Sequence, residues 1–453
     1  MKINFLNKIL KVKKDWINFY KKNKNIESFK NKIKLSTRNF YNSFNKKKIS
    51  FILECKKKSP SLGLLRKNFN LFDISNIYKK YASVISVVTE EKYFGGNFKN
   101  LSIVSNLVKQ PILCKDFIID EYQIYLARYY QADAILLMLS ILHDNEYIYL
   151  SNIAKKLNMG VLTEINNIDE MKRAIKLKSK IIGINNRNLN NLSIDLNITK
   201  KIAPLIPKKN IIISESGIDS FKKIRKLKKI VNGFLIGSYI MKKKNIKNTI
   251  KSLIFGNNKI CGLTRKKDAI ISEKSGAIYG GLIFCNNSVR KININLAKKI
   301  INSSNLKYVA VFNNNSIQEI IDICNKINLQ AIQLHGNETQ KFINNLIKKI
   351  NPKIKIWKTF IINNKFPKMN FNFIKHYLFD NNKNNNKKTF NWSILKNKNI
   401  ENVFLAGGLN EKNCKKVMKF NCFGLDFNSG LEKKHRIKDK KKIKNIFNIL
   451  RNY

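Results

Sequence analysis

Residues that could do acid–base chemistry stand where short apolar segments of this chain end. Residues 51–56 begin as an apolar run, Phe-Ile-Leu, and close with Glu54 and Lys56. Side chains alternate between the two faces of a β-strand, so these two charges would share one face. Burying a carboxylate and an ammonium is costly. The pair therefore indicates either an active site at a strand end or an edge strand whose charges are solvated.

Similar endings recur along the first half of the chain. Polar or small residues follow the later apolar runs, namely Lys115, Glu164, Asn185 with Arg187, Glu215 with Ser216 and Gly217, and Gly237 with Ser238. A solvated Lys or a helix-capping Glu would explain each one alone, but their repeated position favours a shared site. Small residues in the last two loops let backbone N–H groups approach phosphate oxygens, which predicts a phosphate site there.

The second half repeats this pattern with other residues. Its strand ends carry Cys261, Arg290, His335 and Asp380, and its last two loops hold Gly407-Gly408 and Ser429-Gly430. The small residues predict a second phosphate site. A buried Cys is often inert packing, but the position of Cys261 at a strand end favours a reactive thiol. His335 fits a structural role equally well.

Short apolar runs, separated by Lys-rich helical segments, must position these residues. Such runs are typical of parallel strands buried on both faces. They predict an α/β protein of two tandem (β/α)8 TIM barrels, residues 1–255 and 256–453, with residues 1 to about 48 as an N-terminal helical extension. The predicted strands are 51–55, 84–88, 111–114, 134–138, 160–163, 180–184, 210–214 and 234–236, then 259–262, 280–284, 307–312, 330–334, 353–357, 377–379, 403–406 and 423–427.

Composition limits the classes of partner. The formal net charge is +59, from 88 Lys and Arg against 29 Asp and Glu. Nucleic acid would suit this charge, but its spread over the whole length favours compositional drift. Seven Cys without a C-x-x-C pair and four separated His predict reduced thiols, no metal site and a cytoplasmic location. The longest apolar run, 134–142, is too short to cross a bilayer, and we expect a monomer without nucleic-acid or membrane partners.

Two classes of function fit a pair of basic barrels: an enzyme acting on sugar phosphates, or a binding protein with non-catalytic barrels. The strand-end residues favour the enzyme. The segments FILECKKKSPSLG, EEKYF, PILCKDFIID, VLTE, GINNRNL, ISESGI and FLIGS resemble indole-3-glycerol phosphate synthase. The segments KICGLTR, GAIYGGLIF, QLHGNE, LFDN, LAGGL and LDFNSG resemble phosphoribosylanthranilate isomerase. Both in this order resemble the bifunctional enzymes of bacterial tryptophan biosynthesis, which need no cofactor.

The first resemblance implies a decarboxylating ring closure that yields indole-3-glycerol phosphate. It implies Lys115 as general acid, Glu164 as the second proton-transfer group, and Glu54 and Asn185 as residues that orient the substrate. Lys56 should lie between the substrate carboxylate and these groups. The further substrate or phosphate contacts implied are Ser59, Phe94, Phe117, Arg187, Glu215, Ser216, Gly217, Gly237 and Ser238.

The second resemblance implies an Amadori rearrangement of N-(5-phosphoribosyl)anthranilate. It implies Asp380 as acid, Cys261 as base and Arg290 as the residue that holds the anthranilate carboxylate. A working Cys261 must be a thiolate, so its pKa should fall below about 8.5, although nearby groups act in both directions. Three stretches depart from the family: 382–388 without a Gly, Asn391 in place of Asp, and 435–436 in place of Pro-Gly. The alternative is an active synthase with a weakened isomerase.

Overall fold

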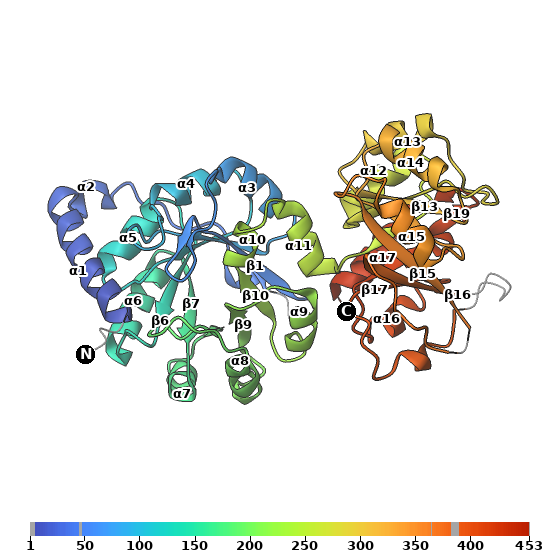
Figure 1. Cartoon of the computed structure of the whole chain (residues 1–453). Coiled ribbons are helices and arrows are strands. Elements are labelled where there is room, and N and C mark those ends of the chain that lie inside the picture. The colour runs from blue at the N-terminus through green and yellow to red at the C-terminus, as the bar shows by residue number, and fades with distance from the viewer. Residues whose placement is uncertain (1–4, 45–47, 364, 382–388, 453) are drawn as a thin grey trace. The chain divides into compact units, whose positions relative to one another are not determined.

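The computed structural model describes residues 5–44, 48–363, 365–381 and 389–452. The chain divides into two compact units, residues 1–250 and 251–453. Each unit contains a closed barrel of parallel strands with helices around it (Figure 1). The predicted fold of two (β/α)8 barrels is therefore confirmed.

The first barrel closes where β1 pairs with both β4 and β10, in parallel. Ile52 of β1 lies opposite Val84 on one side and Leu235 on the other. The strands are β1 (Ser50–Cys55), β4 (Val84–Val88), β5 (Ile112–Lys115), β6 (Ala134–Met138), β7 (Gly160–Ile165), β8 (Ile181–Asn185), β9 (Ile211–Glu215) and β10 (Gly233–Ile236). The outer helices are α3 (Leu71–Tyr78), α4 (Lys99–Ser105), α5 (Glu121–Tyr129), α6 (Asp144–Lys156), α7 (Ile168–Lys176), α8 (Asn197–Ile202), α9 (Phe221–Leu227), α10 (Ser238–Met241) and α11 (Ile246–Phe255).

The N-terminal extension is helical, as predicted, and it packs on the first barrel. It consists of α1 (Phe5–Asn23), α2 (Glu27–Lys30) and the 3-10 turn η1 (Tyr41–Ser43). Apolar residues of α1 face inward, and Leu6 and Ile9 join the core cluster that fills the barrel. Lys13 of α1 is also buried and lies 2.7 Å from Asp116, just beyond β5. An apolar stripe and one buried ion pair thus hold α1 in place.

The second barrel has the same topology, with β11 paired to both β12 and β18. Its strands are β11 (Lys259–Ile260), β12 (Tyr279–Ile283), β13 (Lys307–Phe312), β14 (Ala331–Leu334), β15 (Lys355–Ile362), β16 (Ile374–Asn381), β17 (Val403–Leu405) and β18 (Gly424–Phe427). Its helices are α12 (Lys266–Ser275), α13 (Ile294–Ile301), α14 (Ile317–Lys326), α15 (Gln340–Ile347), α16 (Cys414–Val417) and α17 (Lys440–Asn452). Strands β15 and β16 run several residues further than the sequence predicts.

Two short antiparallel hairpins lie outside the barrels' sheets. The pair β2 (Lys58–Ser59) and β3 (Gly63–Leu64) follows β1 in the first unit. The pair β19 (Glu432–Lys434) and β20 (Ile437–Lys438) follows β18 in the second. Neither hairpin is predicted from the sequence, because strands of two or three residues leave no periodic signal. Each one brings polar side chains to a candidate site described below.

Aromatic rings fill the core of the second barrel. The Trp357 ring stacks on Phe404 with centroids 4.7 Å apart, and Tyr279 meets both rings edge-on. His376 of β16 belongs to the same cluster, with its ring centroid 3.9 Å from that of Phe423. Among the described residues, no helix is long and apolar enough to span a membrane.

Candidate active sites

A cavity of about 330 Å³ opens in the first barrel. Strand ends and the loops after them line it, which is where chemistry is found in barrels of this type. All the residues predicted for the first site line this one cavity: Glu54, Lys56, Ser59, Phe94, Lys115, Phe117, Glu164, Asn185, Arg187, Glu215, Ser216, Gly217, Gly237 and Ser238. The structure thus brings together residues that span most of the first unit's sequence.

Lys115 lies at the centre of a charged network in this cavity. Its Nζ is 2.8 Å from Glu164 Oε2 and 3.3 Å from Glu215 Oε2. Asn185 Nδ2 donates a hydrogen bond to the other oxygen of Glu164 at 3.0 Å. The Glu164 carboxylate is therefore held between an amide and an ammonium, which leaves it little freedom to rotate.

The cavity favours the charged form of Lys115 but the neutral form of Glu215. Burial favours a lower pKa for Lys115, but the carboxylates of Glu164, Glu215 and Glu54 raise this pKa well above its ordinary value. Burial raises the pKa of Glu215 to about 8, against the opposing effect of Lys115. We therefore expect a charged Lys115 and a largely protonated Glu215 near pH 7, an acid pair in one cavity.

Two glycines make room for carboxylates in this cavity. A Cβ on Gly237 would collide with the Glu54 carboxylate, and one on Gly183 would collide with that of Glu215. Glu54 Oε2 also lies 2.6 Å from Lys56 Nζ, so the two charges that end the first strand are indeed partners. Gly183 lies in the middle of β8 and Gly237 directly follows β10, and at both positions only a missing side chain lets the carboxylate approach.

The turn after β9 has the backbone expected of an anion site. Ser216 and Gly217 both have positive φ, 63° and 79°. Successive residues in such conformations direct their N–H groups to one side, which suits phosphate. Ser59 is buried, and its Oγ lies 3.3 Å from Ser61 Oγ in the connection between β2 and β3. Arg187 Nη1 donates to the same Ser61 at 3.1 Å, so this arginine ties the β8 loop to the hairpin.

An aromatic wall and the N-terminal helix complete the cavity. The Phe94 and Phe117 rings lie 6.2 Å apart, and Phe5 and Ile9 of α1 line the same space. Glu90 fixes the loop that carries Phe94, because its carboxylate accepts hydrogen bonds from the N–H groups of residues 92, 93 and 94. Burial raises the pKa of Glu90. The contribution of α1 is not visible in the sequence, since nothing there shows where an amphipathic helix docks.

Cys261 in the second barrel has a buried ion pair as its neighbour. Lys259 Nζ lies 2.7 Å from Asp426 Oδ2, with both side chains almost fully buried. The Lys259 ammonium also lowers the pKa of the Cys261 thiol. Asp426 Oδ1 has no hydrogen-bond partner among the described residues. Lys259 and Asp426 lie inside the quoted segments KICGLTR and LDFNSG, so their position was visible in the sequence although their role was not.

The structure gives a direction for the Cys261 pKa, which the sequence leaves open. Burial raises the pKa of this thiol and Asp426 adds to the rise, whereas Lys259 and Lys438 lower it by less. A working thiolate would need a lowered pKa. The buried Asp426 competes with the thiolate for Lys259, which favours the thiol form of Cys261.

Asp380 and His335 come together from two strand ends. His335 Nε2 lies 3.6 Å from Asp380 Oδ2, and its Nδ1 is 3.1 Å from Gln333 Nε2. Gln333 also donates to Thr359 Oγ1 at 3.1 Å. His335 therefore accepts a hydrogen bond through Nδ1, which leaves Nε2 to carry the proton and face the acid.

Buried charges also hold the loop after His335. Glu338 accepts hydrogen bonds from the N–H groups of Gly336 and Asn314, and Lys358 Nζ lies 2.7 Å from Glu338 Oε2. In the loop after β17, Gly407 and Gly408 have φ of 82° and 64°. Such a backbone suits the phosphate site that the sequence predicts there. Ser429 and Gly430 form the 3-10 turn η4 (Ser429–Leu431) after β18.

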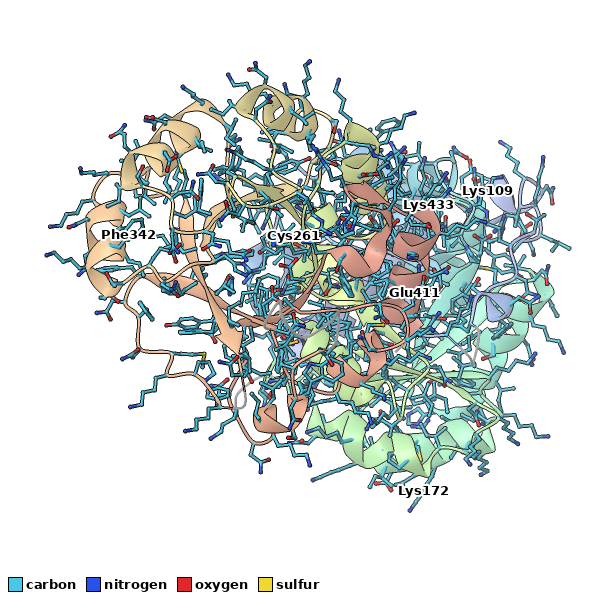
Figure 2. The ribbon with its side chains drawn as sticks, turned by 90° about the vertical axis from the view of Figure 1, so that its right-hand side faces the viewer. Lys109, Lys172, Cys261, Phe342, Glu411 and Lys433 are labelled. Carbon is cyan, nitrogen blue, oxygen red and sulfur yellow. The ribbon has the colours of Figure 1, made fainter. Side chains whose placement is uncertain are left out.

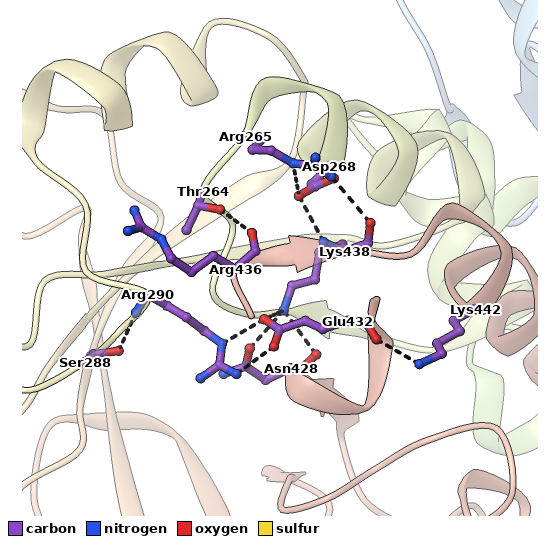
Figure 3. A network of polar contacts seen from close by, with 10 residues as sticks. All are labelled: Thr264, Arg265, Asp268, Ser288, Arg290, Asn428, Glu432, Arg436, Lys438 and Lys442. Atoms are coloured by element: carbon purple, nitrogen blue, oxygen red, sulfur yellow. Dashed lines mark hydrogen bonds and ion pairs between the residues drawn. The ribbon is translucent and has the colours of Figure 1, made fainter. Parts of the chain in front are cut away.

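Arg290 already has a protein partner. Its Nε and Nη2 each donate to one oxygen of Glu432 at 2.7 Å, a bidentate pair (Figure 3). Lys438 Nζ lies 3.1 Å from the same carboxylate. Glu432 and Lys438 belong to the β19–β20 hairpin, and neither is predicted as a site residue.

The structure shows the local conformation at two positions where the sequence departs from the isomerase pattern, Asn391 and Arg436. Asn391 caps the 3-10 turn η3 (Trp392–Leu395) by accepting from Ser393 N at 3.0 Å, as an Asp would. Arg436 occupies the hairpin turn with φ of 70°, a conformation that suits the family's Gly better. The stretch 382–388 lies outside the described residues.

Thiols and metal ligands can be assessed over the described part of the chain. Cys55, Cys114, Cys261, Cys324 and Cys414 are free thiols within the described ranges. No group of three or more His, Cys, Asp or Glu side chains in the described ranges is arranged to hold a metal ion.

Comparisons with known proteins agree with this geometry. The family model "Indole-3-glycerol phosphate synthase" matches residues 6–253, and "N-(5'phosphoribosyl)anthranilate (PRA) isomerase" matches residues 258–449. The Tryptophan biosynthesis protein TrpCF of Buchnera aphidicola subsp. Schizaphis graminum is 58% identical over 447 residues, covering 99% of both chains. The chain belongs to the TrpCF family. The TrpCF proteins of Salmonella typhi and Yersinia pestis are each 46% identical and cover 99% of this chain and 99% and 94% of their own.

Membership in the TrpCF family confirms the predicted function. The N-terminal unit is an indole-3-glycerol phosphate synthase, and the C-terminal unit is a phosphoribosylanthranilate isomerase. The chain is therefore a bifunctional enzyme of tryptophan biosynthesis that acts on phosphorylated substrates.

Proposed function

We propose that Lys115 and Glu164 carry the proton transfers of ring closure, and that Cys261 and Asp380 carry those of the isomerisation. The observation that supports the first assignment is the Lys115–Glu164 pair, at 2.8 Å inside the cavity of the first unit. The observation that supports the second is the position of Cys261 and Asp380 at strand ends of one barrel, each beside a second polar group.

Ring closure uses the charged Lys115 as the acid. Its ammonium protonates the ketone oxygen of the 1-(2-carboxyphenylamino)-1-deoxyribulose 5-phosphate while the ring carbon attacks, and CO₂ leaves from that carbon. Loss of water then gives the indole, and Glu164 accepts a proton in this step. Asn185 fixes Glu164 for the transfer. The site around them supplies Glu54, Lys56 and Arg187 for orientation and for the substrate carboxylate, Phe94 and Phe117 for the ring, and Ser59, Glu215, Ser216, Gly217, Gly237 and Ser238 for the sugar phosphate.

Isomerisation needs an acid and a base on one substrate. Asp380 protonates the ribose ring oxygen and opens the ring, and the Cys261 thiolate removes the proton from C2′ of the resulting imine. Reprotonation gives the amino ketone. Arg290 holds the anthranilate carboxylate, with His335 beside the acid and with Gly407, Gly408, Ser429 and Gly430 at the phosphate. The raised pKa of Cys261 and the strained Arg436 favour a second candidate, a synthase with a slower isomerase.

We further propose the division of the chain and its setting in the cell. The two activities divide at residues 255 and 256, where α11 ends, and the enzyme works as a cytoplasmic monomer without nucleic-acid or membrane partners. The spread of charge supports the absence of a nucleic-acid partner, because within the first unit Lys109 and Lys172 lie far apart, at the upper right and at the bottom of the view (Figure 2). A nucleic-acid site would gather them in one stripe.

Paired substitutions test the assignments. Lys115→Ala should lower synthase turnover by at least about a thousandfold and leave isomerase turnover unchanged, because only ring closure uses this acid. Cys261→Ser should do the reverse. Each substrate is supplied separately to the full chain, and the change in anthranilate-type fluorescence is followed. Unchanged synthase turnover in Lys115→Ala, or an intact isomerase in Cys261→Ser, would assign the step to another residue.

A further inference from the structure

A buried carboxylate in the second unit is bound by two cations at once. Glu432 is only 8% exposed. Its Oε1 accepts from Arg290 Nε at 2.7 Å and from Lys438 Nζ at 3.1 Å, and its Oε2 accepts from Arg290 Nη2 at 2.7 Å (Figure 3). The pKa of Glu432 is lowered because these hydrogen bonds and charges outweigh its burial. The carboxylate is thus ionised and fully engaged.

The hairpin that carries Glu432 is itself fixed to the barrel. Lys438 Nζ donates to Asn428 Oδ1 at 2.9 Å and to the Asn428 carbonyl at 3.1 Å. The Lys438 N–H donates to Asp268 Oδ2 at 3.2 Å, and Asp268 is held in turn by Arg265 of the preceding loop (Figure 3). Glu432 therefore stands on a rigid support, because α12 and the end of β18 both anchor its hairpin.

Arg290 crosses the strand end next to Cys261. A Cβ built on Gly262 would lie 2.7 Å from Arg290 Cδ and 2.7 Å from Asn428 Oδ1. The arginine stem thus lies over Gly262, directly after the proposed base. Gly262 also has φ of 68°, so both space and backbone conformation require glycine there. The guanidinium is consequently held beside the reacting part of the site.

The hydrogen bonds to Glu432 use one edge of the guanidinium. A guanidinium has five N–H groups in a planar fork, and the pair with Glu432 occupies Nε and one N–H of Nη2. Nη1 makes no hydrogen bond within the described residues, so the end-on edge formed by Nη1 and the outer N–H of Nη2 stays available. This edge matches a second carboxylate bidentately. Arg290, Lys438 and Glu432 together carry one net positive charge, which attracts a carboxylate ligand.

We propose that Glu432 is a positioning residue for the isomerase: it fixes Arg290 side-on, so that the end-on edge is preset for the anthranilate carboxylate. This inference rests on the proposed role of Arg290. A long arginine side chain loses much rotamer freedom when it binds a ligand. Glu432 imposes that loss during folding, and Lys438 offsets the negative charge that would otherwise repel the substrate. Substrate affinity then gains from preorganisation.

The test compares Glu432→Gln with a matched control in the full chain. Glu273→Gln is the control, because Glu273 of α12 is also 8% exposed and has Lys251, 3.8 Å away, as its cation. In Glu432→Gln the KM of isomerisation should rise about tenfold with kcat changed by less than about threefold, because the loss is in binding. N-(5-phosphoribosyl)aniline, which lacks the carboxylate, should keep its KM. Glu273→Gln should leave both constants unchanged.

A second background separates the inference from the role of Arg290. Arg290→Lys alone should raise the KM, and adding Glu432→Gln to it should raise the KM no further, because both act through one guanidinium. A lower KM in Glu432→Gln, an equal rise with the aniline substrate, or multiplied effects in the double variant would each overturn the inference. An unchanged KM in Arg290→Lys would overturn the role of Arg290 itself. Turnover of N-(5-phosphoribosyl)aniline by the same variant reports that the second unit is folded, and Glu432→Asp repeats the test if the Gln variant is not.

Discussion

At the residue scale, the two proposed proton carriers differ in what surrounds them. Lys115 lies among carboxylates that raise its pKa, so the proposed acid of the synthase is charged before any substrate binds. Cys261 lies beside Lys259, which Asp426 also binds. Burial therefore favours the protonated form of the proposed isomerase base. Its activation depends on how Lys259 divides its charge between the carboxylate and the thiol.

Lys259→Met should slow alkylation of Cys261 about tenfold or more at pH 8, because the thiolate loses the cation that stabilises it. Isomerase kcat/KM should fall by at least a similar factor. Iodoacetamide labelling of the Cys261 peptide, followed by mass spectrometry over a range of pH, measures the first effect. Urea unfolding of the second unit in the same sample serves as the folding control.

Asp426→Asn is the matched variant, and we expect it to change the rate of Cys261 alkylation in the opposite direction. It removes the carboxylate that competes for Lys259 and raises the thiol pKa, so alkylation of Cys261 should become faster at the same pH. Equal rates in the two variants would show that the ion pair does not control this thiol.

Residue types at strand ends were predictable, whereas their partners were not. Lys115, Glu164 and Asn185 stand out because charged or amide groups end apolar runs. Glu432 has no such signal, since it begins a three-residue strand in a Lys-rich stretch. Its pairing with Arg290 spans 142 positions in the sequence and depends on how the β19–β20 hairpin folds back. Sequence periodicity carries no information about contacts of this kind.

At the element scale, the β19–β20 hairpin turns through an unfavourable residue. Arg436 has φ of 70° and is exposed, and a left-handed conformation costs a residue with a Cβ about 1 kcal/mol. Arg436→Gly should therefore stabilise the second unit by up to about 1 kcal/mol, because glycine adopts this conformation without strain. Urea unfolding of the full chain measures the change. Lys434→Gly is the control: Lys434 lies in β19 without positive φ, so glycine there should destabilise the unit.

The helix α1 offers a second element whose anchoring can be measured. Lys13→Met leaves Asp116 buried without its cation, which should destabilise the first unit by about 3 kcal/mol. Thr89 and the Phe117 N–H still donate to Asp116, so we expect the lower end of the usual range. Synthase KM should rise as well, because Phe5 and Ile9 of α1 line the cavity.

Lys21→Met is the matched control on the same helix. Lys21 also lies 2.7 Å from a carboxylate, that of Asp120, but its side chain is 45% exposed. An exposed pair contributes less than about 1 kcal/mol, so unfolding and synthase KM should hardly change. Equal losses from Lys13→Met and Lys21→Met would mean that burial does not set the strength of the anchor.

At the whole-molecule scale, each unit has its own core and its own site, and the excess of lysine lies outside both. The repeated apolar runs made the two barrels predictable because parallel strands are buried on both faces. The ends of β15 and β16 were not predictable, because these strands continue past the predicted apolar runs into polar residues such as Lys358 and Asp380. The division of the chain into two units also lets stability respond to pH in one unit alone.

His376 makes the second unit sensitive to acid. Burial among Trp357, Phe404 and Phe423 lowers its pKa from 6.5 to about 4, and Lys375 adds to the shift. The folded state thus keeps this histidine neutral, while the unfolded chain binds a proton below about pH 6.5. Its contribution to stability is complete above pH 6.5 and is lost as the pH falls toward 4, by roughly 3 kcal/mol in total.

His376→Phe should remove this part of the pH dependence, because phenylalanine keeps the aromatic packing and binds no proton. Urea unfolding at pH 7, 6, 5 and 4 measures it, with the fluorescence of Trp357, which lies in the same aromatic cluster, as the probe of the second unit. Carboxylates titrate equally in both proteins, so the difference between their curves isolates His376. At pH 7 the variant should be somewhat less stable, because the Asn402 carbonyl loses its partner on His376 Nδ1. Two curves that stay parallel from pH 7 to pH 4 would show that the pKa of His376 is the same in the folded and unfolded states.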